Sequence, residues 1–107
     1  MALTRDFRQT VAARVERDPA FARAMLDEAS TLFLNGEPET ARTMLRDLVN
    51  ATIGFEPLAK LTGKPAKSLH RMLSAGGNPS MDNLATIFDV LRDALKVEIE
   101  VRAVEAA

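Results

Sequence analysis

The sequence predicts an all-α fold of five to six helices, with a short β-strand near the C-terminus. Three features of the 107-residue chain support this prediction. Apolar residues recur every three or four positions through most of the chain, as on the buried face of an amphipathic helix. Proline, glycine and asparagine interrupt this period at a few places, where helices are expected to begin or end. Strict alternation of apolar and charged residues, which is typical of a strand, occurs only near the end of the chain.

The first two helices are separated by an Asp-Pro pair. A narrow apolar stripe marks the first helix, which should end near Asp18 and contains Leu3, Phe7, Val11 and Val15. Asp18 supplies an N-cap acceptor, and Pro19 suits the first position of a second helix. The second helix should end at Asn35-Gly36. Its predicted apolar face consists of Phe21, Met25, Ala29 and Leu32.

A third helix is expected to begin at Glu37-Pro38-Glu39, because proline and acidic residues favour a first helical turn. Gly54 should end this region. The wide apolar stripe predicts burial between neighbouring elements, and it consists of Ala41, Met44, Leu45, Leu48, Val49 and Ile53.

The net charge of the chain is -1, but the charges are unevenly distributed. Residues 1–54 carry 7 basic and 8 acidic groups, and residues 79–107 carry 3 basic and 6 acidic groups. Residues 55–78, in contrast, carry 4 basic groups and 1 acidic group. The middle of the chain is therefore the region expected to meet a polyanion.

This basic region contains "LAKLTGKPAKSLHRML", which predicts two short helices joined by a sharp turn. Gly63 can adopt the left-handed conformation that ends a helix, and Lys64-Pro65 should begin the next helix, over 65–75. Ala59 and Gly63 lie four residues apart, so their small side chains are expected to let the two helices approach closely. Bulk at either position should push the helices apart.

The second of these helices should have two different faces. Steps of 100° per residue place Pro65, Leu69, Met72 and Leu73 on a core face. The opposite side, which we call the basic face, consists of Lys64, Lys67, Ser68 and Arg71. A helix about 10–12 Å across fits the major groove of B-form DNA, which is about 12 Å wide. A basic face alone is also common on solvated helices, so it is the glycine turn that favours DNA binding.

The loop "SAGGNP" precedes a last helix that Ser80 should cap. Asn78 in this loop either contacts phosphate or shapes the turn before Pro79. The apolar face of the last helix should contain Leu84, Ile87, Phe88, Leu91 and Leu95.

The predicted strand contains Val97, Ile99 and Val101, which alternate with charged residues. A single strand in a helical chain has unpaired backbone groups, and the same strand of a second copy could pair with them in a homodimer. The alternative is a tail that frays or docks on its own chain.

Residues 55–95 resemble the helix-turn-helix of the XRE (Cro/C1-type) family. The resemblance lies in Ala59 and Gly63, in the apolar residues Leu58, Leu69 and Met72, and in "GGNP" followed by "SMDNLATIFDVL". Upstream, "DPAFARAMLDEA" and "NGEPETARTMLRDLVNATIGFEPLAKLTG" are similar to short bacterial addiction-module antidote proteins, which are type II antitoxins. The resemblance implies one compact domain with a helical region at 1–54, a DNA-binding module at 55–95 and a strand and tail at 96–107.

The resemblance also implies roles for individual residues. The residues implied to set the geometry of the helix-turn-helix are Ala59, Gly63, Leu69 and Met72. The residues implied to read base edges are Lys67, Ser68 and Arg71, beside Ala66. The residues implied to contact phosphates are Lys60, Lys64 and Asn78. The chain departs from the family in having Lys64-Pro65 where a serine or threonine cap is frequent, and in lacking Gln and Asn on this helix. We therefore expect Arg71 or Lys67 to contact guanine rather than adenine.

Other classes of function have little support in the sequence. The chain has no Cys and a single histidine, His70, which excludes thiolate and histidine-rich metal sites. No catalytic pair or cofactor motif is recognisable, and no segment reads as a signal peptide or membrane span, so we expect a cytoplasmic protein that is not an enzyme. The predicted function is a sequence-specific regulator of transcription that binds double-stranded DNA as a homodimer and represses its own operon. The alternative is an antitoxin whose residues 1–54 bind and neutralise a protein toxin.

Overall fold

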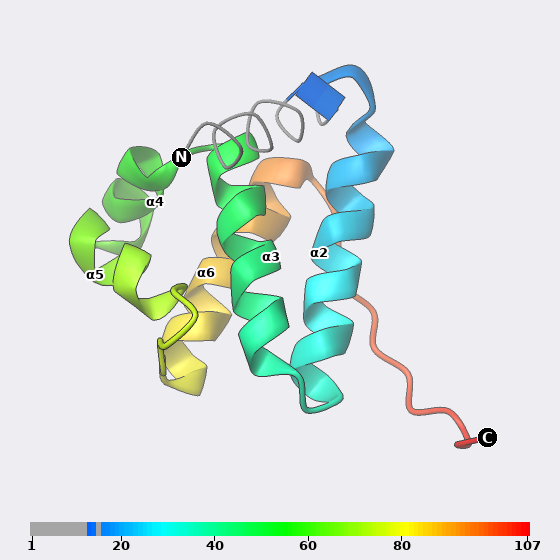
Figure 1. Cartoon of the computed structure of the whole chain (residues 1–107). Coiled ribbons are helices and arrows are strands. Elements are labelled where there is room, and N and C mark those ends of the chain that lie inside the picture. Colours follow the sequence, from blue (N-terminus) through cyan, green and yellow to red (C-terminus); the bar gives the residue numbers. More distant parts are fainter. Residues whose placement is uncertain (1–12, 15) are drawn as a thin grey trace.

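Five α-helices make up most of the described chain in the computed structural model, which describes residues 13–14 and 16–107 (Figure 1). They are α2 (Pro19–Leu34), α3 (Pro38–Ala51), α4 (Phe55–Thr62), α5 (Ala66–Met72) and α6 (Met81–Leu95). The all-α class is confirmed. Most of the first predicted helix lies outside the described residues, although residues 13, 14, 16 and 17 are helical.

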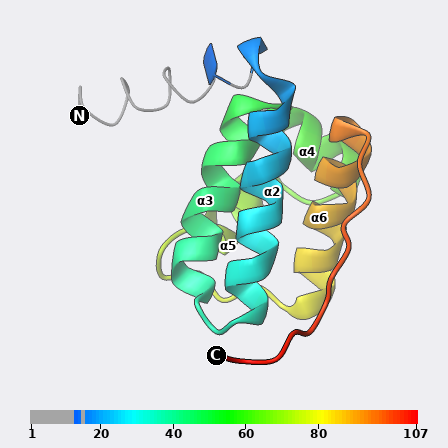
Figure 2. The same ribbon diagram turned by 90° about the vertical axis from the view of Figure 1, so that its right-hand side faces the viewer.

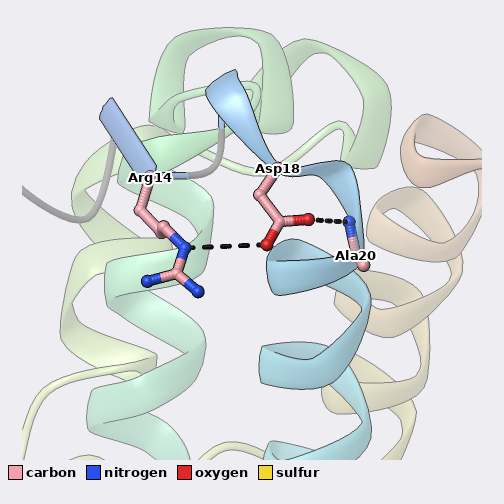
Figure 3. Close-up of polar contacts among 3 residues, drawn as sticks. All are labelled: Arg14, Asp18 and Ala20. Carbon is pink, nitrogen blue, oxygen red and sulfur yellow. Dashed lines mark hydrogen bonds and ion pairs between the residues drawn. The ribbon is translucent and has the colours of Figure 1, made fainter.

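Helix α2 begins at the predicted Asp-Pro pair. The Asp18 side chain accepts a hydrogen bond from the backbone N–H of Ala20 at 3.2 Å, and Arg14 Nε lies 3.6 Å from the other carboxylate oxygen (Figure 3). At the other end, Asn35 is the C-cap residue and Gly36 has a φ of 86°. Helices α2 and α3 therefore form a pair of neighbours joined by a short turn, in agreement with the sequence (Figure 2).

The buried face of α2 differs from the predicted one. Phe21, Met25 and Leu32 are only partly buried. The buried positions are Ala22, Leu26, Ala29 and Ser30. The buried face of α2 is thus rotated by about one residue from the predicted face. The reason is that α2 packs against other helices as well as α3, and that small side chains allow the closest approach between helices.

One hydrophobic cluster joins all five helices. Figure 1 shows α3 in the middle, with α2 on one side and the α4–α5 pair on the other. The largest fully buried side chains are Leu26, Leu45, Leu48, Leu58, Leu69, Leu73, Ile87, Leu91 and Val49. The apolar stripes predicted for α3 and α6 face this cluster, so burial of these leucines stabilises the arrangement that positions α5.

Ser80 caps α6 as predicted, because its hydroxyl accepts a hydrogen bond from the Asn83 N–H at 3.1 Å. Helix α6 ends at Lys96, which has a left-handed backbone (φ 56°) that reverses the chain. None of the described helices is long and apolar enough to cross a lipid bilayer.

The C-terminal segment (97–107) then runs back along α6, beside α2 (Figure 2). No strand is present in the part of the chain that the structure describes. Val97 and Ile99 are partly buried against the core, whereas Glu98 and Glu100 are exposed. The alternating pattern therefore corresponds, within one chain, to an extended segment docked on helices. Pairing across a dimer stays a prediction.

Candidate nucleic-acid interface

The basic region forms two short helices joined by a three-residue turn, Gly63–Pro65. Gly63 is the C-cap residue of α4 with a left-handed backbone (φ 71°), and its N–H donates to the Ala59 carbonyl at 2.9 Å. Thr62 supports the turn, because its hydroxyl donates to the Leu58 carbonyl at 2.8 Å and accepts from the Lys64 N–H at 3.3 Å. The chain leaves α4 in a defined direction.

Helix α5 is shorter than predicted. It covers Ala66–Met72 rather than 65–75, and Pro65 is its N-cap residue with an extended backbone (φ -62°, ψ 141°). Proline has no side-chain acceptor for the first helical N–H groups, and the helix has no side-chain cap. Leu73 ends the helix as its C-cap residue, so the loop takes the last two predicted positions.

The two faces of α5 differ in exposure as the helical period predicts, except at Pro65. The prediction placed Pro65 on the core face, but it is exposed, because it precedes the helix as the N-cap residue with an extended backbone. Leu69 and Leu73 are fully buried, and Met72 packs against the core at partial exposure. On the basic face, Lys67 and Arg71 are exposed, whereas Lys64 and Ser68 are partly buried. Burial of the leucines thus fixes which side of α5 faces the solvent.

The remaining proposed contact residues lie on both sides of α5 in the sequence. Lys60 is exposed in the last turn of α4, and Asn78 is exposed in the loop before α6. Within the described residues, none of the cations at Lys60, Lys64, Lys67 and Arg71 takes part in an ion pair. Their charge is therefore not neutralised by a neighbouring carboxylate.

The role predicted for Gly63 is wrong in one respect. A Cβ atom at Gly63 would meet nothing within 4 Å, so bulk there would not push α4 and α5 apart. Glycine is required by the left-handed backbone instead. Ala59, in contrast, is partly buried and packs against the core, as its predicted role in close packing requires.

The glycine that does permit a close approach is Gly77, which sequence reasoning missed. A Cβ atom there would lie 2.4 Å from the Met72 carbonyl oxygen and 2.6 Å from that of Arg71. The loop thus folds back directly onto the C-terminal end of α5. The only sequence signal was the Gly-Gly pair, which marks a loop without showing which glycine is constrained.

Arg42 on α3 is a second residue that the sequence did not reveal. Its Nε donates to the Ser74 carbonyl at 3.0 Å, and its Nη2 donates to the Ala75 carbonyl at 2.8 Å. These carbonyls follow α5 directly, where a helix leaves acceptors without partners. Arg42 therefore ties the end of α5 to α3, across 32 to 33 residues of sequence.

His70 stacks on the ring of Phe55 in the first turn of α4, with ring centroids 3.8 Å apart and planes at 21°. The contact joins the two short helices at the edge of the hydrophobic core, to which Phe55 belongs. The stacking indicates a packing role for the exposed His70. Among the residues that the structure describes, no group of three or more acidic or histidine side chains could hold a metal ion.

Comparison of the chain with known proteins gives no further guide. No protein-family model, no curated protein and no solved structure matches this chain. Any functional assignment therefore depends on the residues and geometry described above.

Proposed function

We propose that this protein is a sequence-specific regulator of transcription that inserts α5 into the major groove of double-stranded DNA. In this proposal α4, the Gly63–Pro65 turn and α5 form a helix-turn-helix of the XRE type, and α6 packs behind it. The regulator would act as an autorepressor of the addiction-module antidote kind.

One observation carries the proposal. Lys67 and Arg71 project into solvent from a helix whose opposite side, at Leu69, is fully buried. Burial of an apolar side stabilises any short surface helix, and it also holds α5 at the fixed depth and rotation that reading of base edges requires. The left-handed Gly63, the leucine core and the Arg42 tether together hold α5 in this way.

The contacts divide into two classes in this proposal. Lys60, Lys64 and Asn78 lie beside α5 and would contact phosphates, which supply affinity that depends on salt. Lys67, Ser68 and Arg71 would read base edges. Arg71 has the guanidinium fork that suits the two acceptors of guanine.

Selection of bound duplexes from a random pool, at two salt concentrations, tests the proposal. A palindromic consensus that persists at the higher salt is the expected result. A pool that stays random at both salt concentrations would contradict sequence-specific binding.

Two variants then separate the classes of contact. Arg71→Ala should lose about 1–3 kcal/mol on the selected duplex and relax the preference at one base position. Lys64→Ala should weaken all duplexes and lower the salt slope by about one. Arg23→Ala removes an exposed arginine from α2 and is the matched control, which should leave both quantities unchanged. If both test variants lost the same affinity for the selected duplex as for random duplexes, Arg71 would have no role in reading bases.

A second candidate function is neutralisation of a protein toxin through residues 1–54. A groove of about 690 Å³ lies between α2 and α3, with Phe21, Met25 and Met44 among the residues that line it. Such an apolar groove is the kind of surface that binds a partner helix. Co-expression with the product of the adjacent gene tests this candidate. Recovery of a stable complex and rescue of growth would favour an antitoxin, whereas failure of both would leave DNA binding as the function.

A further inference from the structure

Helix α2 carries a second apolar stripe, which the buried core does not cover fully. Phe21, Met25 and Leu32 lie along this stripe, and all three are only partly buried. Phe21 and Met25, together with Met44 of α3, line the groove of about 690 Å³ between α2 and α3. The described helices thus leave apolar surface along one side of the α2–α3 pair. A half-buried apolar stripe of this kind is expected to pack against a further element.

The chain that precedes α2 reaches one end of this groove. Arg14 and Arg17 line that end. The Arg14 guanidinium carbon lies 4.9 Å from the centre of the Phe21 ring. An ion pair with Asp18 holds the Arg14 side chain beside the start of α2 (Figure 3). Residues 1–12, which lie outside the described residues, therefore join the chain at the end of the groove.

The sequence of 1–12 is that of an amphipathic helix which needs a surface to pack on. Leu3, Phe7 and Val11 recur at every fourth residue, as on one face of a helix. A helix rises 1.5 Å per residue, so this segment would span about 18 Å, enough to run along most of α2. A helix of this length is only marginally stable alone, so its stability has to come from packing of the apolar face.

The contact between Arg14 and Phe21 sets the register in which the segment would lie on α2. If residues 1–12 run back beside α2 from this contact, Val11 falls level with Ala24, because both helices have the same rise per residue. Ala24 is exposed and lines the groove. An apolar side chain of the segment thus meets a small residue of the groove.

The same register brings opposite charges together further along the groove. Phe7 falls level with Glu28, and Arg8 lies one residue away from that level. Glu28 is an exposed carboxylate that lines the groove beside Met25. The segment therefore matches the groove in its charge as well as in its apolar face.

We propose that residues 1–12 form a helix that folds back over the α2–α3 groove, with Leu3, Phe7 and Val11 against its apolar floor. In this arrangement the segment closes the groove to other molecules until it is displaced. A tethered segment acts at an effective concentration of about millimolar, so any partner helix has to compete with it. The proposal uses no residue of α4 or α5, and it can fail without a failure of DNA binding.

Cross-linking tests the position of the segment, because the full chain has no cysteine of its own. Val11→Cys combined with Ala24→Cys should form a disulfide within one chain on mild oxidation, since the bond needs Cα atoms within about 7 Å of each other. Val11→Cys combined with Arg23→Cys is the matched control, because Arg23 lines a different pocket, beside the C-terminal segment, and should stay reduced. A bond that forms only between chains would assign the groove to a second copy and overturn the proposal. Equal yields in the two pairs, or no bond in either, would also overturn it.

The fluorescence of the dye ANS, which binds exposed apolar surface, tests whether the segment closes the groove. Phe7→Asp should release the segment and raise the fluorescence by about twofold or more. Gln9→Asp adds the same charge on the opposite side of the proposed helix and is the matched control, which should leave the fluorescence unchanged. Equal fluorescence of Phe7→Asp and the wild-type chain would contradict closure of the groove.

A charge exchange tests the register and separates release of the segment from loss of the fold. Arg8→Glu places a carboxylate beside Glu28 and should also raise the ANS fluorescence. Glu28→Arg in the same chain restores an opposite-charge pair, so it should reverse the rise, which a chain that had lost its fold would not do. Failure of the second substitution to reverse the first would exclude this register.

Discussion

Two glycines near α5 show how one residue type can be required for different physical reasons. Gly63 has open space around it but a left-handed backbone, so its role is conformational. Gly77 has no positive φ, but the carbonyl oxygens at the end of α5 occupy the place that a Cβ atom would take. The first glycine sets the direction of the chain into α5, and the second lets the chain close over the end of α5.

At Gly77 we predict a large effect from a single methyl group. Gly77→Ala should destabilise the protein by about 1–3 kcal/mol, because the Met72 carbonyl is backbone and can move only with α5. Gly76→Ala is the neighbouring control, since a Cβ atom there meets nothing within 4 Å, and its effect should stay within about 0.5 kcal/mol. Urea denaturation measures both. Equal effects of the two substitutions would show that the close contact carries no free energy.

At the scale of elements, α5 depends on its neighbours for its existence. A helix of seven residues is too short to be stable alone, and α5 has no side-chain cap. Its stability comes from burial of Leu69 and Leu73 and from Arg42, which bonds to the carbonyls beyond its end. Helix α5 is thus held from two sides.

The tether from α3 gives a prediction for Arg42. Arg42→Ala removes both hydrogen bonds to Ser74 and Ala75, and should cost about 1–2 kcal/mol because one of them is partly shielded from water. Hydrogen exchange should speed up at the amides of 73–78 more than elsewhere in the chain. Arg23→Ala again serves as the control. Exchange that changes uniformly over the chain would show that Arg42 supports general stability rather than this loop.

At the scale of the whole molecule, the predicted dimer relates two copies of α5 by a two-fold axis. The C-terminal segment, for which the sequence predicts pairing, lies on the α2–α6 side of the molecule, whereas α5 lies beyond α3 (Figures 1 and 2). Dimeric helix-turn-helix proteins bind half-sites related by the same symmetry. The segment predicted to pair in a dimer and the surface proposed to read DNA are therefore separate parts of the chain.

The whole-molecule prediction combines the proposed DNA binding with the homodimer that the sequence predicts. The operator should hold two half-sites about 34 Å apart, or one helical turn of DNA. Insertion of about 5 base pairs between them, which rotates one half-site by half a turn, should remove cooperative binding in a mobility-shift titration. Val101→Asp should lower affinity for the full operator and leave affinity for a single half-site unchanged. Loss on the half-site as well would show that Val101 acts on the fold instead.

The helix boundaries were largely predictable because their signals act over a few residues. Asp18-Pro19, Asn35-Gly36 and Ser80 end or begin helices where the sequence indicated, and the exposure of Lys67 and Arg71 follows the helical period. The buried face of α2 was less predictable, since apolar residues nearly surround that helix. Only packing against the other helices selects Leu26 over Phe21 for the core.

The sequence by itself determined the helical class, the left-handed turn at Gly63 and the separation of basic from apolar side chains on α5, because caps, glycine conformations and the helical period are local properties. Only the tertiary structure decided that Arg42 holds the end of α5, that Gly77 closes against it and that the C-terminal segment lies on α2 and α6. Those contacts join residues that are distant in the sequence or depend on how the chain folds back on itself. No local pattern encodes which surfaces will meet, so packing of the whole core selects them.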